Sequence, residues 1–180
     1  MELIGRTGDD PNGDALLVAL SRVGVGHVAV LRDPAQATPV VEPPPTDESP
    51  LGADPAPVSP TAQRGPSLDP EDVTLGLSYV DTYTVLVATD DVPATAFPAV
   101  VEAAAFAGAQ LVVIVPPGRP APAALPAEAT VLAAPDEADD GEFATLVGEY
   151  AAALDRGMRP AEAFALATGV AGWEALDTEG

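Results

Sequence analysis

The sequence predicts an α/β fold, a three-layer sandwich built on a mostly parallel sheet. Short continuous runs of apolar, β-branched residues, which are typical of strands buried on both faces, alternate with longer segments of helical periodicity. The chain has 180 residues, 47% of them hydrophobic, which is enough for a domain with a buried core. Strands that alternate with helices form a parallel sheet covered on both faces, with right-handed crossover connections.

The first part of the chain predicts a strand, a helix and a second strand. The segment ELIG, residues 2–5, is a short strand that runs into a glycine-rich turn. A helix follows from Pro11 or Asn12, because apolar residues then recur every three or four positions, and Gly24 ends it. The second strand is HVAVLRD, His27–Asp33.

A segment rich in proline, small residues and acids, Pro34–Ser67, interrupts this pattern. Such a segment cannot bury enough apolar surface to offset the entropy lost on ordering. We therefore expect a disordered or polyproline-like insert at 34–67. It separates a first part of the α/β domain at 1–33 from the remainder at 68–176, and a tail follows at 177–180.

The remainder of the chain predicts four helices and three buried strands. One helix is capped by Ser67 or Asp69, and the next, PATAFPAVVEAAAFAGA, is closed by Gly108. Two more helices close the chain, one ending at Gly157 and one starting at Pro160. The three strands are TVLVATD (84–90), QLVVIVPP (110–117) and ATVLAAP (129–135).

Composition excludes several classes of function. With 28 acidic residues against 7 basic ones, all arginine, the net charge is -21, and such a surface repels nucleic acid and anionic membranes. The absence of cysteine and the single histidine exclude disulfides, a thiol nucleophile and a multi-histidine metal site. No signal-peptide pattern is visible at the N-terminus. We therefore expect a cytoplasmic protein with no metal site and with no nucleic-acid or membrane partner.

One window, Ala96–Pro117, imitates a membrane span. It is rich in alanine, which contributes little to insertion, and it contains Pro98, Glu102 and Gln110. We interpret it as a buried helix followed by a buried strand.

The segment GRTGDDPNGDALLVALSRVGVGHVAVLRD joins a glycine- and aspartate-rich turn to a helix, a Gly-Val pair and a strand. It is similar to the G-x-V-G-D-D-x-x-G segment of the PfkB carbohydrate kinase family, which has the ribokinase-like fold. The matching positions include Gly5, Gly8, Asp9, Asp10 and Gly13. Later segments resemble the middle of that family, its "PNE" strand and its closing helix pair. They are LDPEDV to VIVPPG, then LPAEATVLAAPDEAD, then GEFATLVGEYAAALDRGMRPAEAFALATGVAG.

The resemblance implies an ATP-dependent kinase, but the segment that would carry catalysis departs from the family. The family's D-T-x-G-A-G-D loop supplies an anion hole of backbone amides and a catalytic aspartate. Here the segment is DEADDGEF, in which Gly141 stands where the catalytic aspartate belongs. Ala138, Asp139 and Asp140 stand at the glycine-rich positions, where acids would repel a phosphate. The family's nucleotide-binding strands before this loop and its sugar-binding and lid strands also have no counterpart, so the chain resembles a shortened, degenerate member.

Four residues of the glycine-rich turn, Gly8, Asp9, Asp10 and Gly13, are candidate substrate-binding residues, because the resemblance places this turn near the substrate pocket. The alternative is that Asp9 or Asp10 only favours the start of the helix. The spacing matches neither G-x-x-x-x-G-K-[ST] nor G-x-G-x-x-G, so the turn carries no phosphate-binding fingerprint.

Acidic residues elsewhere are further candidates. Asp90 and Asp91 end a buried strand, at the edge of the sheet where open α/β folds bind ligands, and are candidate substrate-binding residues. The acids from Asp136 to Glu142 offer oxygen ligands for Mg²⁺ or Ca²⁺, but they do not match the calcium-loop pattern. The alternative is a solvated loop whose acids suit the helix that follows.

Two functions follow from these patterns. The first is a degenerate PfkB-type protein that has lost phosphoryl transfer. It would have a ligand-binding, regulatory or structural role, with a small molecule, a second copy or a kinase-like partner. The second is an active carbohydrate or nucleoside kinase that uses ATP and Mg²⁺, with Asp139 or Asp140 as a displaced catalytic base.

Overall fold

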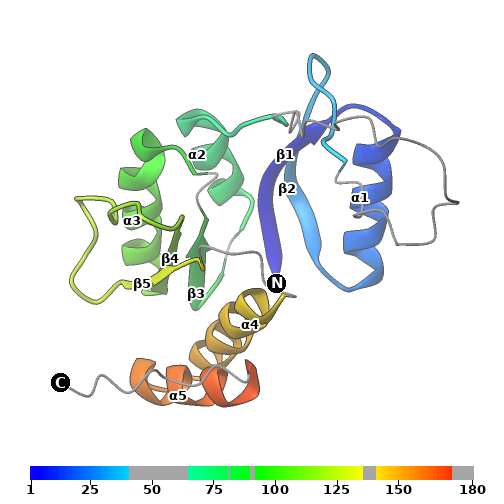
Figure 1. Ribbon diagram of the computed structural model, residues 1–180. Coiled ribbons are helices and arrows are strands. Elements are labelled where there is room, and N and C mark those ends of the chain that lie inside the picture. The colour runs from blue at the N-terminus through cyan, green and yellow to red at the C-terminus, as the bar shows by residue number, and fades with distance from the viewer. Residues whose placement is uncertain (41–64, 81, 90–91, 136–140, 172–180) are drawn as a thin grey trace, which may run out of the picture. The chain divides into compact units, whose positions relative to one another are not determined.

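The computed structural model describes residues 1–40, 65–80, 82–89, 92–135 and 141–171 (Figure 1). The chain divides into two compact units, Met1–Ser67 and Leu68–Gly180, and each is described by itself. Strands pair within each unit, in a sheet of two strands in the first and of three in the second. All of these pairings are parallel, as the sequence predicts.

The first unit is a strand–helix–strand motif. It consists of β1 (Glu2–Gly8), α1 (Pro11–Arg22) and β2 (Gly26–Asp33). The predicted starts of the helix and of the second strand are confirmed to within a residue. The predicted end of the first strand is wrong: β1 runs on through Gly5 to Gly8, because these residues pair with Val30 to Asp33 of β2. The turn is therefore confined to the two residues between Gly8 and Pro11.

The sheet of the second unit has the strand order β3-β4-β5. These strands are β3 (Val85–Ala88), β4 (Gln110–Val115) and β5 (Thr130–Ala133). The central strand is buried on both faces, since the neighbouring residues Val112 and Val113 point to opposite faces and are both 0% exposed. This explains why its sequence is a continuous apolar run instead of an alternating one.

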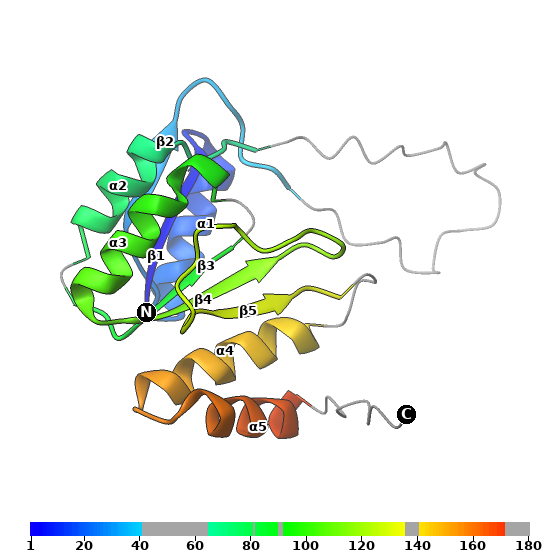
Figure 2. The same cartoon turned by 90° about the vertical axis from the view of Figure 1, so that its left-hand side faces the viewer.

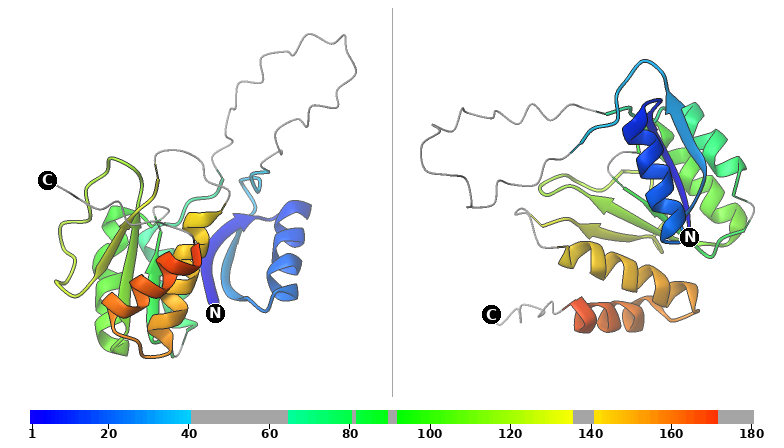
Figure 3. Two further views of the ribbon diagram at one scale, coloured as in Figure 1. Left: turned by 60° about the horizontal axis from the view of Figure 1, so that its bottom comes forward. Right: turned by 90° about the vertical axis from the view of Figure 1, so that its right-hand side faces the viewer.

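Helices cover both faces of this sheet, which makes the second unit a three-layer sandwich (Figure 2). On one face lie α2 (Pro70–Ser78), a short 3₁₀ turn (Ala94–Ala96) and α3 (Phe97–Ala107). On the other lie α4 (Glu142–Asp155) and α5 (Pro160–Ala171), which pack side by side (Figure 3). The first core joins Val73, Ala88, Ala96, Phe97, Val100, Ala104, Leu111, Val113 and Val115, and the second joins Val112, Leu132, Leu146, Tyr150, Ala153, Leu154, Ala163 and Ala167.

The ends of these helices follow from local chemistry. The Asp69 side chain caps α2 by accepting hydrogen bonds from the backbone amides of Glu71 and Asp72. In turn, the Asp72 side chain accepts a hydrogen bond from the Asp69 amide. Gly108 ends α3 with a φ of 65°, a conformation that favours glycine. The predicted division of Ala96–Pro117 into a helix and a strand is thus confirmed by α3 and β4. Within the described ranges, no helix has the length and hydropathy needed to cross a membrane.

Tyr150 is the largest fully buried side chain of the second core. Its hydroxyl lies 2.8 Å from the Thr130 hydroxyl of β5, and its ring meets the edge of Phe164 with centroids 6.1 Å apart. One side chain on α4 therefore joins the edge strand to α5. The buried side chain thus has a hydrogen-bond partner for its hydroxyl and an aromatic contact for its ring.

We predict a graded loss of stability at Tyr150. Tyr150→Phe removes the hydroxyl bond to Thr130 and should lower the free energy of unfolding by about 1 kcal/mol. Tyr150→Ala also empties the ring site and should cost about 3–5 kcal/mol. Urea denaturation followed by circular dichroism measures both. Phe106→Ala is the control, because Phe106 is 95% exposed; an equal loss in Phe106→Ala and Tyr150→Ala would contradict the prediction.

Candidate functional site

The predicted residues of the glycine-rich turn gather at the carboxyl ends of β1 and β2. Gly8 ends β1, Asp9 and Asp10 form the turn, and Gly13 lies in the first turn of α1. In open α/β sheets this edge is where ligands bind, because the side chains and helix N-termini that follow parallel strands meet there. The structure thus brings Gly8, Asp9, Asp10 and Gly13 together with the residues that follow β2.

A closed set of hydrogen bonds, here called the Asp10–Thr38 network, joins Thr7, Gly8, Asp10, Gly13 and Thr38. One Asp10 oxygen, Oδ1, accepts from the Gly13 amide at 2.8 Å and from the Thr38 hydroxyl at 2.8 Å. The other, Oδ2, accepts from the Thr38 amide at 2.7 Å. The carboxylate therefore caps α1 and at the same time holds the chain that follows β2.

The Thr38 hydroxyl has no spare hydrogen-bonding capacity for a small ligand. It donates its single hydrogen to Asp10, so the Thr7 hydroxyl at 2.9 Å must donate to it, and the Gly8 amide donates to it at 3.0 Å. A hydroxyl has one hydrogen and two acceptor sites, and all three are used here.

Two glycines let the backbone segments of this network approach each other. A Cβ on Gly8 would lie 2.6 Å from both the Gln36 carbonyl oxygen and the Thr38 amide nitrogen. A Cβ on Gly13 would lie 2.4 Å from the Gly8 carbonyl oxygen. Backbone atoms cannot move away as a flexible side chain can, so both positions require glycine.

These hydrogen bonds lower the pKa of Asp10 below its ordinary value. The Gly13 amide is the largest cause, followed by the Thr38 amide and hydroxyl. Donors that point at a carboxylate stabilise its charged form. Asp10 is therefore ionised near neutral pH, and its bonds serve the fold, as the helix-start alternative predicts.

Arginines of the two strands neutralise the neighbouring acids. The Arg32 guanidinium donates to Asp14 at 2.7 Å and to Asp9 at 2.8 Å, and these bonds raise the pKa of Arg32. Arg6 lies 3.4 Å from Asp33, which is 7% exposed and also accepts from the Ala35 amide at 2.8 Å. The edge thus contains carboxylates already paired with the guanidinium groups beside them.

The chemistry open to this edge is limited. Asp10 cannot act as a general base without breaking the capping bonds that hold the turn. A phosphate would meet the carboxylates of Asp9, Asp10, Asp14 and Asp33, and its attraction to Arg32 would compete with two existing ion pairs. Asp9 and Asp14 keep 56% and 69% of their side chains exposed, so neutral hydroxyl donors suit this edge better than anions.

The other predicted site residues fall mostly outside the described ranges. Asp90 and Asp91 do, as do Asp136, Glu137, Ala138, Asp139 and Asp140. Gly141 is described as the N-cap of α4, with a φ of 91° and no side chain to cap the helix. Its carbonyl oxygen accepts from the amide and the hydroxyl of Thr145, both at 2.9 Å. Among described residues, no group of three or more potential metal ligands occurs.

Sequence reasoning missed Thr38 and Arg32. Thr38 belongs to the segment expected to be an insert from Pro34 onward, yet Pro34–Val40 is part of the described structure. Its contacts are made with residues about 30 positions earlier, so no local pattern announces them. Arg32 carried only a weak signal in the sequence, as a charged residue near the end of a predicted strand that follows a turn rich in aspartate.

Comparisons with known proteins bear on the fold. No protein-family model and no curated protein sequence matches the chain. Among solved structures, the chain is similar to the crystal structure of a PfkB protein from Polaromonas sp. JS666. The TM-score is 0.53 and the identity 18%, over 96% of this chain and 80% of that one. The chain therefore has a PfkB-like, ribokinase-like α/β fold, and the likeness extends to the fold alone.

Gly13→Ala should destabilise the protein although it introduces a better helix former. The new methyl group meets backbone at Gly8, and overpacking of this kind costs about 1–3 kcal/mol. Gly148→Ala is the matched control: Gly148 lies within α4 with open space around its Cα, so helix propensity should stabilise that variant by up to about 1 kcal/mol. Chemical denaturation of both measures the difference, and a stabilised Gly13→Ala variant would contradict the close approach.

Asp10→Asn should weaken the protein in a pH-dependent way. Both Asp10 oxygens accept hydrogen bonds, whereas asparagine has one oxygen and one NH₂ group. The NH₂ group would face the Thr38 or Gly13 donors and could not accept from them. Because the folded pKa of Asp10 lies below its ordinary value of 3.8, its contribution is complete above that pH and is lost as the pH falls through the folded value. The stability difference between wild type and Asp10→Asn should therefore be large at pH 7 and shrink below about pH 4. Denaturation at a series of pH values measures it, and a constant difference would disprove the assignment.

Proposed function

We propose that this chain is a ribokinase-like protein that has lost phosphoryl transfer and acts through binding, in a regulatory or structural role. The observation that carries the proposal is Gly141 at the start of α4. The resemblance to PfkB kinases places the catalytic aspartate at this position, and here the residue has no side chain. Without a carboxylate at this position, the hydroxyl to be phosphorylated lacks the base that the family supplies there.

The charge around the start of α4 supports the same conclusion. The family's anion hole depends on glycines at a helix N-terminus, which let backbone amides approach the phosphate. Glu142, which is exposed, follows Gly141 in the first turn of α4. Residues 136–142 contain five acids and no basic residue by sequence, and these acids would oppose the approach of a nucleoside triphosphate.

The geometry of the first unit adds a second line of support. At the edge where the resemblance places the substrate, the Asp10 carboxylate and the Thr38 hydroxyl are both committed to the Asp10–Thr38 network. The glycine-rich turn that resembles the PfkB family therefore has a structural role in this network, and that role does not require enzymatic activity. Asp9 and Asp14 each use one oxygen to pair with Arg32 but stay largely exposed, so their remaining acceptor sites suit the hydroxyl groups of a neutral polyhydroxy compound.

The proposal predicts that the purified chain releases no ADP above a protein-free blank when incubated with ATP, Mg²⁺ and a panel of sugars and nucleosides. Asp139→Asn and Asp140→Asn should behave as wild type does. Glu149→Gln, which removes an acid from the body of α4, is the matched control for the change in charge. Release that follows the concentration of the chain and is abolished by Asp139→Asn or Asp140→Asn would replace the proposal with the active-kinase alternative.

The binding role is tested with the same panel. A ligand that binds the folded state raises the midpoint of thermal unfolding. We expect a sugar or nucleoside to raise it in wild type and less in Asp9→Asn, and ATP alone to leave it unchanged. A shift produced by ATP and Mg²⁺ without any sugar would contradict the loss of the nucleotide site.

A further inference from the structure

The second unit has an open sheet edge at β5. This strand pairs with β4 on one side, and among the described residues no strand pairs with its other side. The Ala134 amide donates to the Val115 carbonyl of β4 at 2.9 Å. Because successive residues of a strand direct their backbone groups to opposite sides, the amides and carbonyls of Val131 and Ala133 point away from β4. Both residues are exposed.

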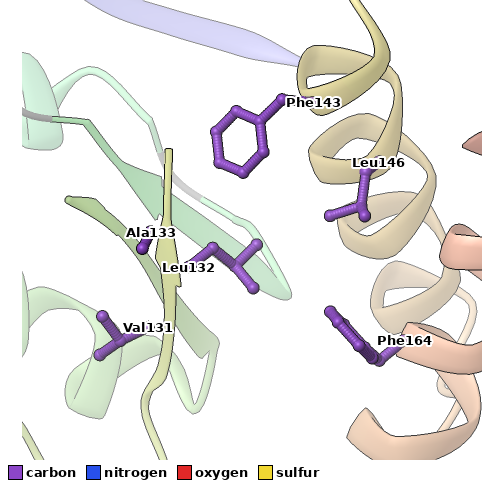
Figure 4. Close-up of a pocket in the computed structure, with 6 residues that line it drawn as sticks. All are labelled: Val131, Leu132, Ala133, Phe143, Leu146 and Phe164. Carbon is purple, nitrogen blue, oxygen red and sulfur yellow. The ribbon is translucent and has the colours of Figure 1, made fainter. Parts of the chain in front are cut away.

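An apolar hollow lies directly beside this edge (Figure 4). The walls come from β5 and from two helices, and the residues are Val131, Leu132, Ala133, Phe143, Leu146 and Phe164. Its volume is about 190 Å³. Sites for drug-sized molecules measure roughly 300–1,000 Å³ and present convergent polar groups, so this hollow suits one apolar side chain better than a whole small molecule.

Acids predominate in the sequence on both sides of β5. Between Arg119 and Arg156 the chain contains eight acids and no basic residue. Of these, the exposed carboxylates of Glu128 and Glu142 lie in the chain on either side of β5, close to its first residue and to Phe143 of the hollow. A second copy of the chain would bring the same negative charge to the same edge. A segment rich in lysine or arginine complements it instead.

We propose that β5 is a docking edge for an extended segment of a basic partner protein, which adds a strand to the sheet. The backbone groups of Val131 and Ala133 would bond the added strand, as in other cases of strand addition. An apolar side chain of the segment would fill the hollow between β5, α4 and α5, and its positive charge would be attracted to the acids that flank β5 in the sequence, Glu128 and Glu142. This docking is independent of whether the chain transfers phosphoryl groups.

The test uses the full chain and a short, end-capped peptide of alternating valine and lysine, with binding measured by calorimetry. Two control peptides separate the contributions. One carries glutamate in place of lysine, and the other keeps every side chain but is N-methylated at every residue, which removes the backbone donors of both edges. We expect the parent peptide to bind, the N-methylated peptide to bind at least about tenfold more weakly, and the glutamate peptide not to bind.

Variants of the chain test the same edge from the other side. Ala133→Pro removes an outward amide and leaves the bonds from β5 to β4 in place, as proline at a strand edge does. Ala133→Val, the matched control, keeps the amide. We expect a loss of about tenfold in affinity for Ala133→Pro and wild-type affinity for Ala133→Val.

Equal binding of the parent and N-methylated peptides would show attraction by charge alone and would overturn the proposal, as would no binding of the parent peptide. Both comparisons use the wild-type chain, so they decide the matter even if Ala133→Pro fails to fold.

Discussion

The burial of β4 on both faces is the constraint on which the second unit depends. Val112 and Val113 are neighbours in the strand, point to opposite sides and are both fully buried. A strand of this kind cannot stand at a solvent surface, so each face of the sheet must carry a helical layer. The α2–α3 pair covers one face and the α4–α5 pair the other, and each pair supplies one of the two cores. Burial of one strand therefore fixes the three-layer arrangement.

In the first unit a single carboxylate organises the segments around it. Asp10 caps α1 through the Gly13 amide and holds the chain after β2 through Thr38. Because Gly8 and Gly13 have no side chains, the three backbone segments approach closely enough for these bonds. A short strand–helix–strand motif offers little apolar area to bury, and several exposed apolar side chains such as Val18 and Val28 reflect this. Directional polar bonds therefore have a large part in defining its turn.

Much of the fold was predictable because the decisive signals are local. The apolar run QLVVIV defines β4, Asp69 and Pro70 start α2, and Gly108 ends α3. The full length of β1 was not predictable. The sequence of Gly5–Gly8 is typical of a turn, but these residues pair with β2 and so continue the strand. Gly8, Asp9, Asp10 and Gly13 lie together at the turn because they are close in the sequence, and their binding role stays a prediction. The role of Thr38 was not predicted, because its partners lie about 30 residues away in the sequence and the proline-rich segment around it has no pattern that indicates such contacts.

The two proposals are connected by which polar groups of the described residues already have partners within the protein and which face outward. At the carboxyl ends of β1 and β2, hydrogen bonds and ion pairs within the unit already engage Asp10, Thr38 and Arg32. At the start of α4, Gly141 contributes no side chain. At β5, by contrast, backbone donors and acceptors face outward beside an unfilled apolar hollow. Catalysis needs convergent polar side chains, whereas strand addition needs an open edge and one apolar recess. The described residues of β5 and the hollow beside it match the requirements of strand addition, and the proposed docking rests on this match.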